Sequence, residues 1–284
     1  MSLVARFALA LPLLAATPAL AQETPPPREG PAIDRDTVTV GVGAVYMPDY
    51  EGSNDYRVAP APGAIGSVSG FSFVLAGNRA SVDLIPNRPG PGWDLQAGPL
   101  AVVNFDRSST RSIDDARVKA LGKVDTAVEL GGYVGIGKTG LITSDYDKLS
   151  VSLSWRHDVA GAHDSSILQP SINYMTPLSR KAAVVLFASA ERAAGGYADT
   201  YFSITPEQSA ASGLPVYRAR AGWKNWSAGA LAMVSIDGDL LHGFKLIGGG
   251  VYRGMLGDFA ESPIVRDAGS RSQWMGVLGL GYTF

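Results

Sequence analysis

The C-terminal stretch Arg271–Phe284 constrains the fold of this chain more than any other segment. Successive side chains of an extended strand point to opposite faces. One face of this stretch is large and apolar with aromatic residues at both ends, and the other is small or polar. An apolar face bordered by aromatics is the signature of a transmembrane β-strand, which needs about 9–11 residues when tilted. The last strand of a soluble β-sandwich is the alternative interpretation of this stretch taken alone.

The N-terminus indicates an exported protein. Arg6 is the only charged side chain before Glu23, and Phe7–Ala16 is an apolar run too short to cross a bilayer as a helix. Ala19-Leu20-Ala21 supplies a small-x-small cleavage site. We therefore predict a signal peptide that is cleaved after Ala21.

The predicted organisation is a signal peptide (1–21), a flexible leader rich in proline and charge (22–36) and one barrel domain (37–284). No later stretch has roughly 18 consecutive apolar residues, so a transmembrane helix is not predicted. The absence of cysteine excludes a disulfide framework and thiolate metal sites. With a formal net charge of −2, nothing indicates a nucleic-acid partner.

Alternation recurs along the chain and predicts twelve strands, an even number as in bacterial barrels with both ends on one side. In 148–159, for example, Leu149, Val151 and Leu153 oppose charged Lys148 and Arg156. Charge on a lipid-facing side costs about 2–4 kcal/mol near the midplane, whereas a wet lumen accepts it. The prediction is an all-β, antiparallel, up-and-down transmembrane barrel in the cell outer membrane. The predicted strands are Thr37–Tyr46, Arg57–Val68, Phe71–Ile85, Trp93–Phe105, Val124–Gly137, Lys148–Val159, Ile167–Thr176, Ala182–Arg192, Pro215–Trp223, Trp226–Ile236, Leu240–Gly254 and Ser272–Phe284.

This strand count has a consequence for the connections. With both termini in the periplasm, it places the long segments Asp106–Lys123 and Ala193–Leu214 on the periplasmic side. Met47–Tyr56 and Met255–Arg271 then lie outside the cell. Long periplasmic connections are unusual, because bacterial barrels have short periplasmic turns.

Ala193–Leu214 is the segment most suited to binding a partner. Thr205 and Pro206 predict a short helix, with threonine at the N-cap and proline at the first helical position, and Gly213 ends it. The predicted partner-binding residues are Tyr201, Phe202, Thr205, Pro206 and Glu207.

Charged residues on the predicted inner faces mix both signs. Such a set either closes a small barrel through internal ion pairs or lines a narrow pore. Twelve strands lie between the filled eight-stranded barrels and the open channels of sixteen, so we expect a partly occluded lumen. The lumen candidates are Asp94, Asp125, Glu129, Lys148, Arg156, Arg218, Arg220, Lys245 and Arg253.

Two motifs suggest chemistry that their context argues against. Gly132–Thr139 fits a phosphate-loop pattern, but it lies inside a predicted strand and no helix follows, so no nucleotide is predicted. His163-Asp164-Ser165 brings imidazole, carboxylate and hydroxyl together, yet neighbours on an extended chain point apart. A turn is favoured there, with a hydrolase at the barrel rim as the alternative. We predict no enzyme, and no catalytic, cofactor-binding or metal-ligating residue.

Stretches spread along almost the whole chain resemble the MipA/OmpV family of outer-membrane proteins (MltA-interacting protein). Pro48–Ser53 (Pro-x-Tyr-x-Gly-Ser) and Ser262–Ile264 (Ser-Pro-Ile) are fairly specific together. Ser203 departs from the glycine expected in the family's Tyr-Phe-Gly pattern. The matching stretches are Val42–Tyr56, the pair Pro60 and Pro62, Thr126–Gly132, Gly161–Asp164, Tyr201–Tyr217, Gly257–Val265 and Gly281–Phe284.

The resemblance implies an outer-membrane barrel in contact with lipid. For the member that names the family it implies a non-enzymatic scaffold that bridges a murein lytic transglycosylase and a peptidoglycan synthase. Other members resemble porins or adhesins. The alternatives for this chain are therefore a small-solute channel, which the mixed lumen charges also suggest, and an adhesin.

Overall fold

The computed structural model describes residues 36–86 and 90–284. The predicted signal peptide and leader, apart from Asp36, lie outside the described residues. Each strand pairs with the next in antiparallel fashion and β12 pairs back with β1, so twelve strands form a closed barrel and the fold prediction is confirmed. The strands are β1 (Thr37–Pro48), β2 (Tyr56–Val68), β3 (Phe71–Ala76), β4 (Arg79–Val82), β5 (Gly92–Asn104), β6 (Ala127–Thr139), β7 (Lys148–Asp158), β8 (Ser166–Pro177), β9 (Ala182–Ala193), β10 (Gly222–Ser235), β11 (Gly243–Met255) and β12 (Ser272–Thr283).

Side-chain alternation separates a lipid-facing surface from the lumen. Val42, Leu246 and Leu278 are exposed on the outside, while Glu129 and Lys245 on the inside are buried. The four acidic residues of the described strands all share the inward faces: Asp94, Glu129, Asp158 and Glu191. This distribution is the one expected of a barrel whose outer wall meets hydrocarbon. Within the described part of the chain, no helix is long and apolar enough to cross a membrane.

The predicted number of strands is correct because two errors cancel. The predicted strand Phe71–Ile85 is a hairpin of β3 and β4, since Gly77 takes a positive φ of 59° and turns the chain. The predicted strand Pro215–Trp223 lies mostly in the connection before β10, and only its last two residues, Gly222 and Trp223, join the predicted strand Trp226–Ile236 in the single strand β10. A bulge at Lys224 shifts its register and places both Lys224 and Asn225 on the buried, inward side.

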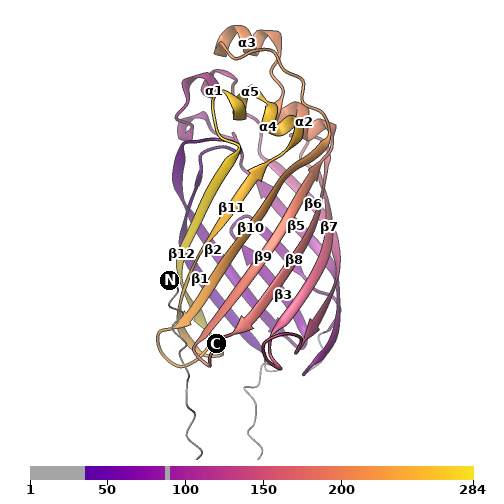
Figure 1. The fold of residues 1–284 in the computed structure, drawn as a ribbon, viewed down its shortest axis with the longest axis vertical. Coiled ribbons are helices and arrows are strands. Elements are labelled where there is room, and N and C mark those ends of the chain that lie inside the picture. Colours follow the sequence, from indigo (N-terminus) through magenta and orange to yellow (C-terminus); the bar gives the residue numbers. More distant parts are fainter. Residues whose placement is uncertain (1–35, 87–89) are drawn as a thin grey trace, which may run out of the picture. The chain divides into compact units, whose positions relative to one another are not determined.

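The same two errors reversed the predicted direction of every strand between them. The long connections 49–55, 105–126, 194–221 and 256–271 therefore lie together at one end of the barrel, opposite the C-terminus (Figure 1). The predicted separation of Asp106–Lys123 and Ala193–Leu214 from the other long connections is wrong. We call this the capped end. The turns 69–70, 83–91, 140–147, 178–181 and 236–242 form the opposite, turn end.

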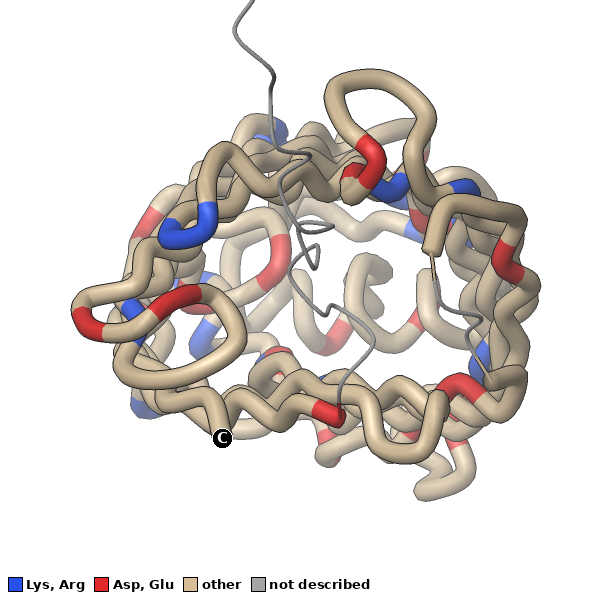
Figure 2. The backbone as a smooth tube through the Cα atoms, turned by 90° about the horizontal axis from the view of Figure 1, so that it is seen from below, with Lys and Arg blue, Asp and Glu red and all other residues tan. Residues whose placement is uncertain are grey.

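All the helices of the described chain are short and lie at the capped end (Figure 1), and helical turns of the backbone are visible through the barrel from the turn end (Figure 2). The helix predicted after Thr205 is confirmed: the Thr205 hydroxyl accepts the Gln208 N–H, Pro206 begins the helix, and Gly213 ends it at φ 74°. The helices are η1 (Thr110–Ser112), α1 (Ala116–Ala120), α2 (Gly195–Phe202), α3 (Pro206–Ser212), α4 (Gly257–Glu261) and α5 (Pro263–Arg266).

Among the residues that the structure describes, nothing pairs with one edge of β2 towards the capped end. The hairpin of β3 and β4 pairs with β2 only from Gly63 to Val68, and the last backbone bond on that edge runs from the Gly77 N–H to the Pro62 carbonyl. Backbone groups of every second residue face the same neighbour, so the nitrogens of Pro60 and Pro62 both face this edge. Proline has no N–H to leave unsatisfied, which suits it to an open edge.

Candidate functional site

The four long connections fold into a packed cap. Tyr197, Tyr201 and Phe202 of α2 pack with Phe259 of α4 in a cluster that also contains Val265, and each of these side chains is at most 2% exposed. The Phe202 and Phe259 rings meet edge to face, with centroids 5.1 Å apart. Aromatic contacts of this kind add about 0.5–1.5 kcal/mol to area burial. The cap is therefore a core in its own right rather than a set of loose loops.

A second cluster joins the first through Tyr217 and ties the connections to one another. It contains Tyr50 from the β1–β2 connection together with Ile113, Leu214 and Ile264 from the other three. The Tyr50 hydroxyl lies 2.8 Å from the Ala268 carbonyl, and the Ser262 hydroxyl donates to the Phe202 carbonyl at 2.7 Å. Each connection is thus held by both apolar contacts and hydrogen bonds to its neighbours.

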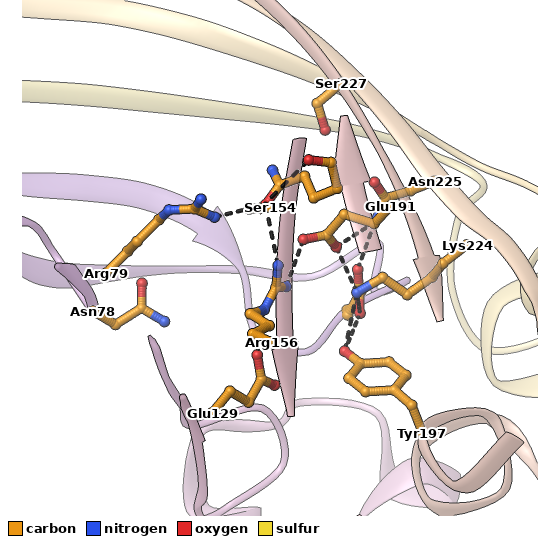
Figure 3. Close-up of polar contacts among 12 residues, drawn as sticks. Asn78, Arg79, Glu129, Ser154, Arg156, Glu191, Tyr197, Lys224, Asn225 and Ser227 are labelled. Carbon is orange, nitrogen blue, oxygen red and sulfur yellow. Dashed lines mark hydrogen bonds and ion pairs between the residues drawn. The ribbon is translucent and has the colours of Figure 1, made fainter. Parts of the chain in front are cut away.

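Directly below the cap, charged side chains of the barrel wall form an ion-pair layer (Figure 3). Arg156 of β7 pairs with Glu129 of β6 and, at 2.7 Å, with Glu191 of β9. Lys224, turned inward by the bulge in β10, lies 2.8 Å from the other Glu191 oxygen. Arg79 of β4 reaches in from the facing wall and donates to the Gln169 side chain at 2.6 Å.

Glu51 connects the cap to this layer. It belongs to the β1–β2 connection, and its carboxylate accepts hydrogen bonds from the Tyr197 hydroxyl at 2.8 Å and from Lys224 and Asn225 at 3.0 Å. Arg253 of β11 lies 3.6 Å from the same carboxylate. Because Glu51 receives groups from α2, β10 and β11 together, it fastens the cap onto the barrel wall.

The low exposure of the central groups of the layer indicates a closed mouth. The side chains of Glu129, Arg156 and Lys224 are 1%, 6% and 3% exposed. A charge taken out of water is costly unless it is paired and hydrogen-bonded, and each of these three is. The layer therefore fills the lumen at the capped end instead of lining an open pore there.

The predicted lumen residues divide into two groups. Glu129, Arg156 and Arg253 belong to the ion-pair layer, and Asp94 and Lys148 form an ion pair nearer the turn end. Lys245 is also inward and buried; it donates to the Thr283 hydroxyl.

For Asp125, Arg218 and Arg220 the prediction is wrong. They lie outside the strands, because β6 begins only at Ala127 and β10 only at Gly222. The Asp125 side chain is 83% exposed, and the exposed Arg220 side chain pairs with Asp258 at 2.7 Å.

The predicted partner-binding residues also divide. Tyr201 and Phe202 are buried in the core of the cap, so they cannot contact a partner in this conformation. Thr205, Pro206 and Glu207 are exposed at the start of α3. Ser203, where the family pattern led us to expect glycine, follows α2 at an ordinary φ of −85° and therefore needs no glycine.

Sequence reasoning missed Glu51, Glu191 and Lys224, three of the central groups of the layer. Alternation along β9 signals Glu191, because Leu186 faces outward and the odd-numbered residues therefore face inward. Lys224 carries no such signal, since the bulge breaks the alternation exactly where it lies. Glu51 belongs to a connection, where periodicity says nothing about direction.

The two motifs considered from the sequence have structural roles. Gly132–Thr139 lies within strand β6, as expected. His163 is buried with its Nε2 3.3 Å from Glu129, whereas the Asp164 side chain is 89% exposed. Asp164 therefore does not orient His163, and the three adjacent residues make no triad.

Asp106 in the cap makes the cap's stability depend on pH. Burial and the nearby Glu51 carboxylate raise the pKa of Asp106 to about 6, above the ordinary value of about 4. The folded cap then binds this proton more tightly than the unfolded one, so its stability falls as the pH rises from about 4 through 6. We expect Asp106→Asn to raise the urea midpoint of the cap at pH 8 and to match the parent protein near pH 4, measured by the near-UV circular dichroism of the cap tyrosines.

The exposed Asp125 provides the control for this measurement, because Asp125→Asn should leave the midpoint unchanged at both pH values. If the cap of Asp106→Asn were less stable than that of the parent protein at pH 8, the ionised carboxylate would stabilise the folded cap and the prediction would be wrong.

Comparison with known proteins gives one family and several remote structures. The family model described as MltA-interacting protein MipA matches residues 40–284. No curated protein matches the chain.

Three solved structures illustrate the remote similarity. The Pseudomonas putida toluene transporter TodX is 9% identical with a TM-score of 0.36, covering 89% of this chain and 90% of that one. An outer-membrane channel of Pseudomonas putida is 12% identical with a TM-score of 0.41, covering 92% and 100%. The translocator domain of the autotransporter NalP from Neisseria meningitidis is 10% identical with a TM-score of 0.34, covering 88% of each chain. At these identities and scores, none of the three indicates what this chain does.

Proposed function

Since this chain belongs to the family of MipA, the MltA-interacting protein, we propose that it is a non-enzymatic outer-membrane scaffold that holds a murein lytic transglycosylase. The family resemblance adds a peptidoglycan synthase as the second enzyme of the assembly. Outer-membrane lipid surrounds the barrel wall in this proposal, and residues 1–21 direct export and are removed.

The observation that carries the proposal is the closed mouth. A general porin needs a continuous aqueous path, whereas here a hydrophobic cap and a buried ion-pair layer fill the capped end. A scaffold has no such requirement and gains a rigid body from the same packing. The closed mouth therefore favours the scaffold over a constitutive channel.

The turn end is the proposed docking face. Bacterial barrels have short periplasmic turns and longer extracellular loops, which places the turn end in the periplasm with the murein. The segment Ala193–Leu214 then lies at the cell surface and is no longer proposed as the site for a murein enzyme. Its exposed residues Thr205, Pro206 and Glu207 remain available to an extracellular partner, as in an adhesin.

Apolar side chains stand out from rigid turns at this end. Ile142, Leu178 and Ile236 are 60–65% exposed. Asp147 fixes the first turn, since its carboxylate accepts the backbone N–H groups of residues 141–143, and these bonds hold its pKa below the usual range against the opposing effect of burial. The other two turns are joined by backbone bonds from residues 235 and 240 to residues 181 and 180. We call Ile142, Leu178 and Ile236 the turn-end surface.

The expected result is that Ile142→Asp with Leu178→Asp weakens capture of a purified lytic transglycosylase of the MltA type at least roughly tenfold. Apolar residues at the centre of an interface each contribute 2 kcal/mol or more when they are hot spots. Binding would be measured by biolayer interferometry on the barrel reconstituted in nanodiscs. The matched control is Pro206→Ala with Glu207→Lys, which changes the exposed start of α3 at the other end and should leave capture unchanged. Loss of capture only in the control would place the docking face at the capped end.

A small-solute channel is the second candidate. The Asp94–Lys148 pair lies in the lumen below the layer, and the Lys148 side chain is 28% exposed, so this part of the lumen is accessible to water. Planar-bilayer recordings distinguish the two functions with the same preparation. Stable conductance steps without capture of the transglycosylase would contradict the scaffold function and support the channel.

A further inference from the structure

The inner faces of β9 to β12 form a continuous apolar wall below the ion-pair layer. Cross-strand register sets their inward residues in rows, and each row contains only apolar or glycine residues. The rows are Phe187–Gly229–Val251–Met275, Val185–Leu231–Gly249–Val277 and Ala183–Met233–Ile247–Gly279. A barrel lumen that holds only water is ordinarily polar, so this wall requires an explanation.

The apolar wall is not covered by the described protein. All twelve of its residues are partly exposed and none is buried. Side chains of this kind gain about 25 cal/mol for each Å² removed from water, so an apolar occupant would be stabilised against them. The predicted leader is an unsuitable occupant, because residues 22–36 are dense in proline and charge.

The adjoining wall of β5 to β8 is polar at the same height, so the lumen has an apolar and a polar side. Ser152 of β7 and Ser171 of β8 are inward and hydrogen-bonded to each other at 2.8 Å. Gln96 of β5 and Asn173 of β8 lie on the same polar side. A ligand with one alkyl chain can lie along β9 to β12 without burying these polar groups against hydrocarbon.

The ion-pair layer offers a place for an anionic head group. Its three carboxylates, Glu51, Glu129 and Glu191, face four cations, Arg79, Arg156, Lys224 and Arg253. Arg253 lies in the row directly above the apolar wall, two residues after Val251 on the inward face of β11. Its side chain remains 28% exposed. A partly exposed cation above an apolar wall matches an alkyl chain that ends in a negative charge.

The second row of the wall leads to the open edge of β2. Val277 pairs with Val45 of β1, and Val45 pairs with Ala59, which lies in the unpaired part of β2. The row from Val185 to Ala59 therefore has no polar side chain along its length. The apolar inner surface thus extends from the wall to the unpaired edge of β2 without passing the cap.

We propose that the lumen binds a single-chain amphiphile with an anionic head group, such as a long-chain fatty acid. Its alkyl chain lies along the apolar wall, its head group faces Arg253, and it exchanges with the membrane past the open edge of β2. The proposal is independent of the scaffold function, because it concerns the lumen and not the turn-end surface.

The test is photolabelling of the full barrel in phosphatidylcholine nanodiscs with palmitate that carries a mid-chain diazirine. Mass spectrometry then maps the labelled residues. The expected result is label on inward residues such as Leu231 and Val277, displaced by excess palmitate. Label confined to outward residues such as Leu246 and Leu278 would show ordinary contact with the lipid belt and overturn the proposal.

Two pairs of variants sharpen the test. Leu231→Asn with Val277→Asn should reduce the lumen label roughly tenfold or more, because apolar contact with the chain is lost. Ser152→Asn with Ser171→Asn introduces the same two asparagines on the polar wall and should leave the label within about twofold. Equal label in both double variants would overturn the apolar wall as the site.

The head group is tested by competition. Hexadecanol should displace the label less well than palmitate, and Arg253→Gln should abolish that difference. Equal displacement by the two compounds from the parent barrel would rule out the anionic head group.

Discussion

Replacing Arg156 with methionine is expected to destabilise the barrel by about 3–5 kcal/mol, the largest effect we foresee for one lumen residue. Arg156 is the only cation that bridges Glu129 and Glu191 among the described residues, and all three are buried or nearly so. Methionine fills similar space but leaves His163 as the remaining partner of Glu129. It also leaves the carboxylates of Glu129 and Glu191 close to each other without a cation between them. The cost arises chiefly from the carboxylates that lose their partner, not from the removed guanidinium.

Urea unfolding of the barrel in lipid vesicles, followed by tryptophan fluorescence, measures this effect. The matched control is Lys148→Met, which also removes a lumen cation from an ion pair but at a more exposed site. We expect that change to cost less than about 1 kcal/mol. Equal losses in the two variants would mean that water penetrates the layer and that the mouth is not closed.

Phe202→Ala is expected to destabilise the cap by about 3–5 kcal/mol while the barrel wall stays folded. The Phe202 ring is fully buried against Tyr197 and Phe259, and alanine leaves a cavity that these rigid neighbours cannot fill. Because the cap has its own core, it can open without breaking the strand ladder. Hydrogen exchange should therefore quicken in 194–221 and 256–271, with little change in β1 to β12.

The control for Phe202→Ala is Val216→Ala in the same connection, where the side chain is 58% exposed and little packing is lost. Exchange in the cap should be unaffected in this variant. If Phe202→Ala instead lowered protection throughout the strands, cap and barrel would form one cooperative unit.

Much of the fold follows from the sequence because the membrane imposes a simple rule on a barrel. Alternation identified the outer surface at Leu149, Val151 and Leu153 and the inward position of Glu129 and Arg156 without any knowledge of neighbours. The capping pattern at Thr205 and Pro206 was equally local, and it identified α3. These features depend on a few adjacent residues and on one environment.

Strand direction depends on rarer signals. Gly77-Asn78 lies within the predicted strand Phe71–Ile85, yet it reverses the chain. The bulge at Lys224 lies inside β10, so Gly222 and Trp223 belong to the same strand as the residues that follow it. Each event involves one or two residues, but each inverts the direction of all that follows. The ion-pair layer was missed for a related reason: Glu51 reaches it from a connection, and its partners come from elements distant in sequence.

The bond from the Tyr50 hydroxyl to the Ala268 carbonyl spans 218 positions of the chain. These two residues meet only after β1 has paired with β12, because β1 leads into the first connection of the cap and β12 follows the last connection. Contacts of such long sequence separation form late. The cluster that contains Tyr50 is thus complete only after the circle of strands has closed. Burial of Tyr50 therefore marks a closed barrel, and a barrel that stalls before closure leaves the apolar partners of Tyr50 exposed and prone to aggregate.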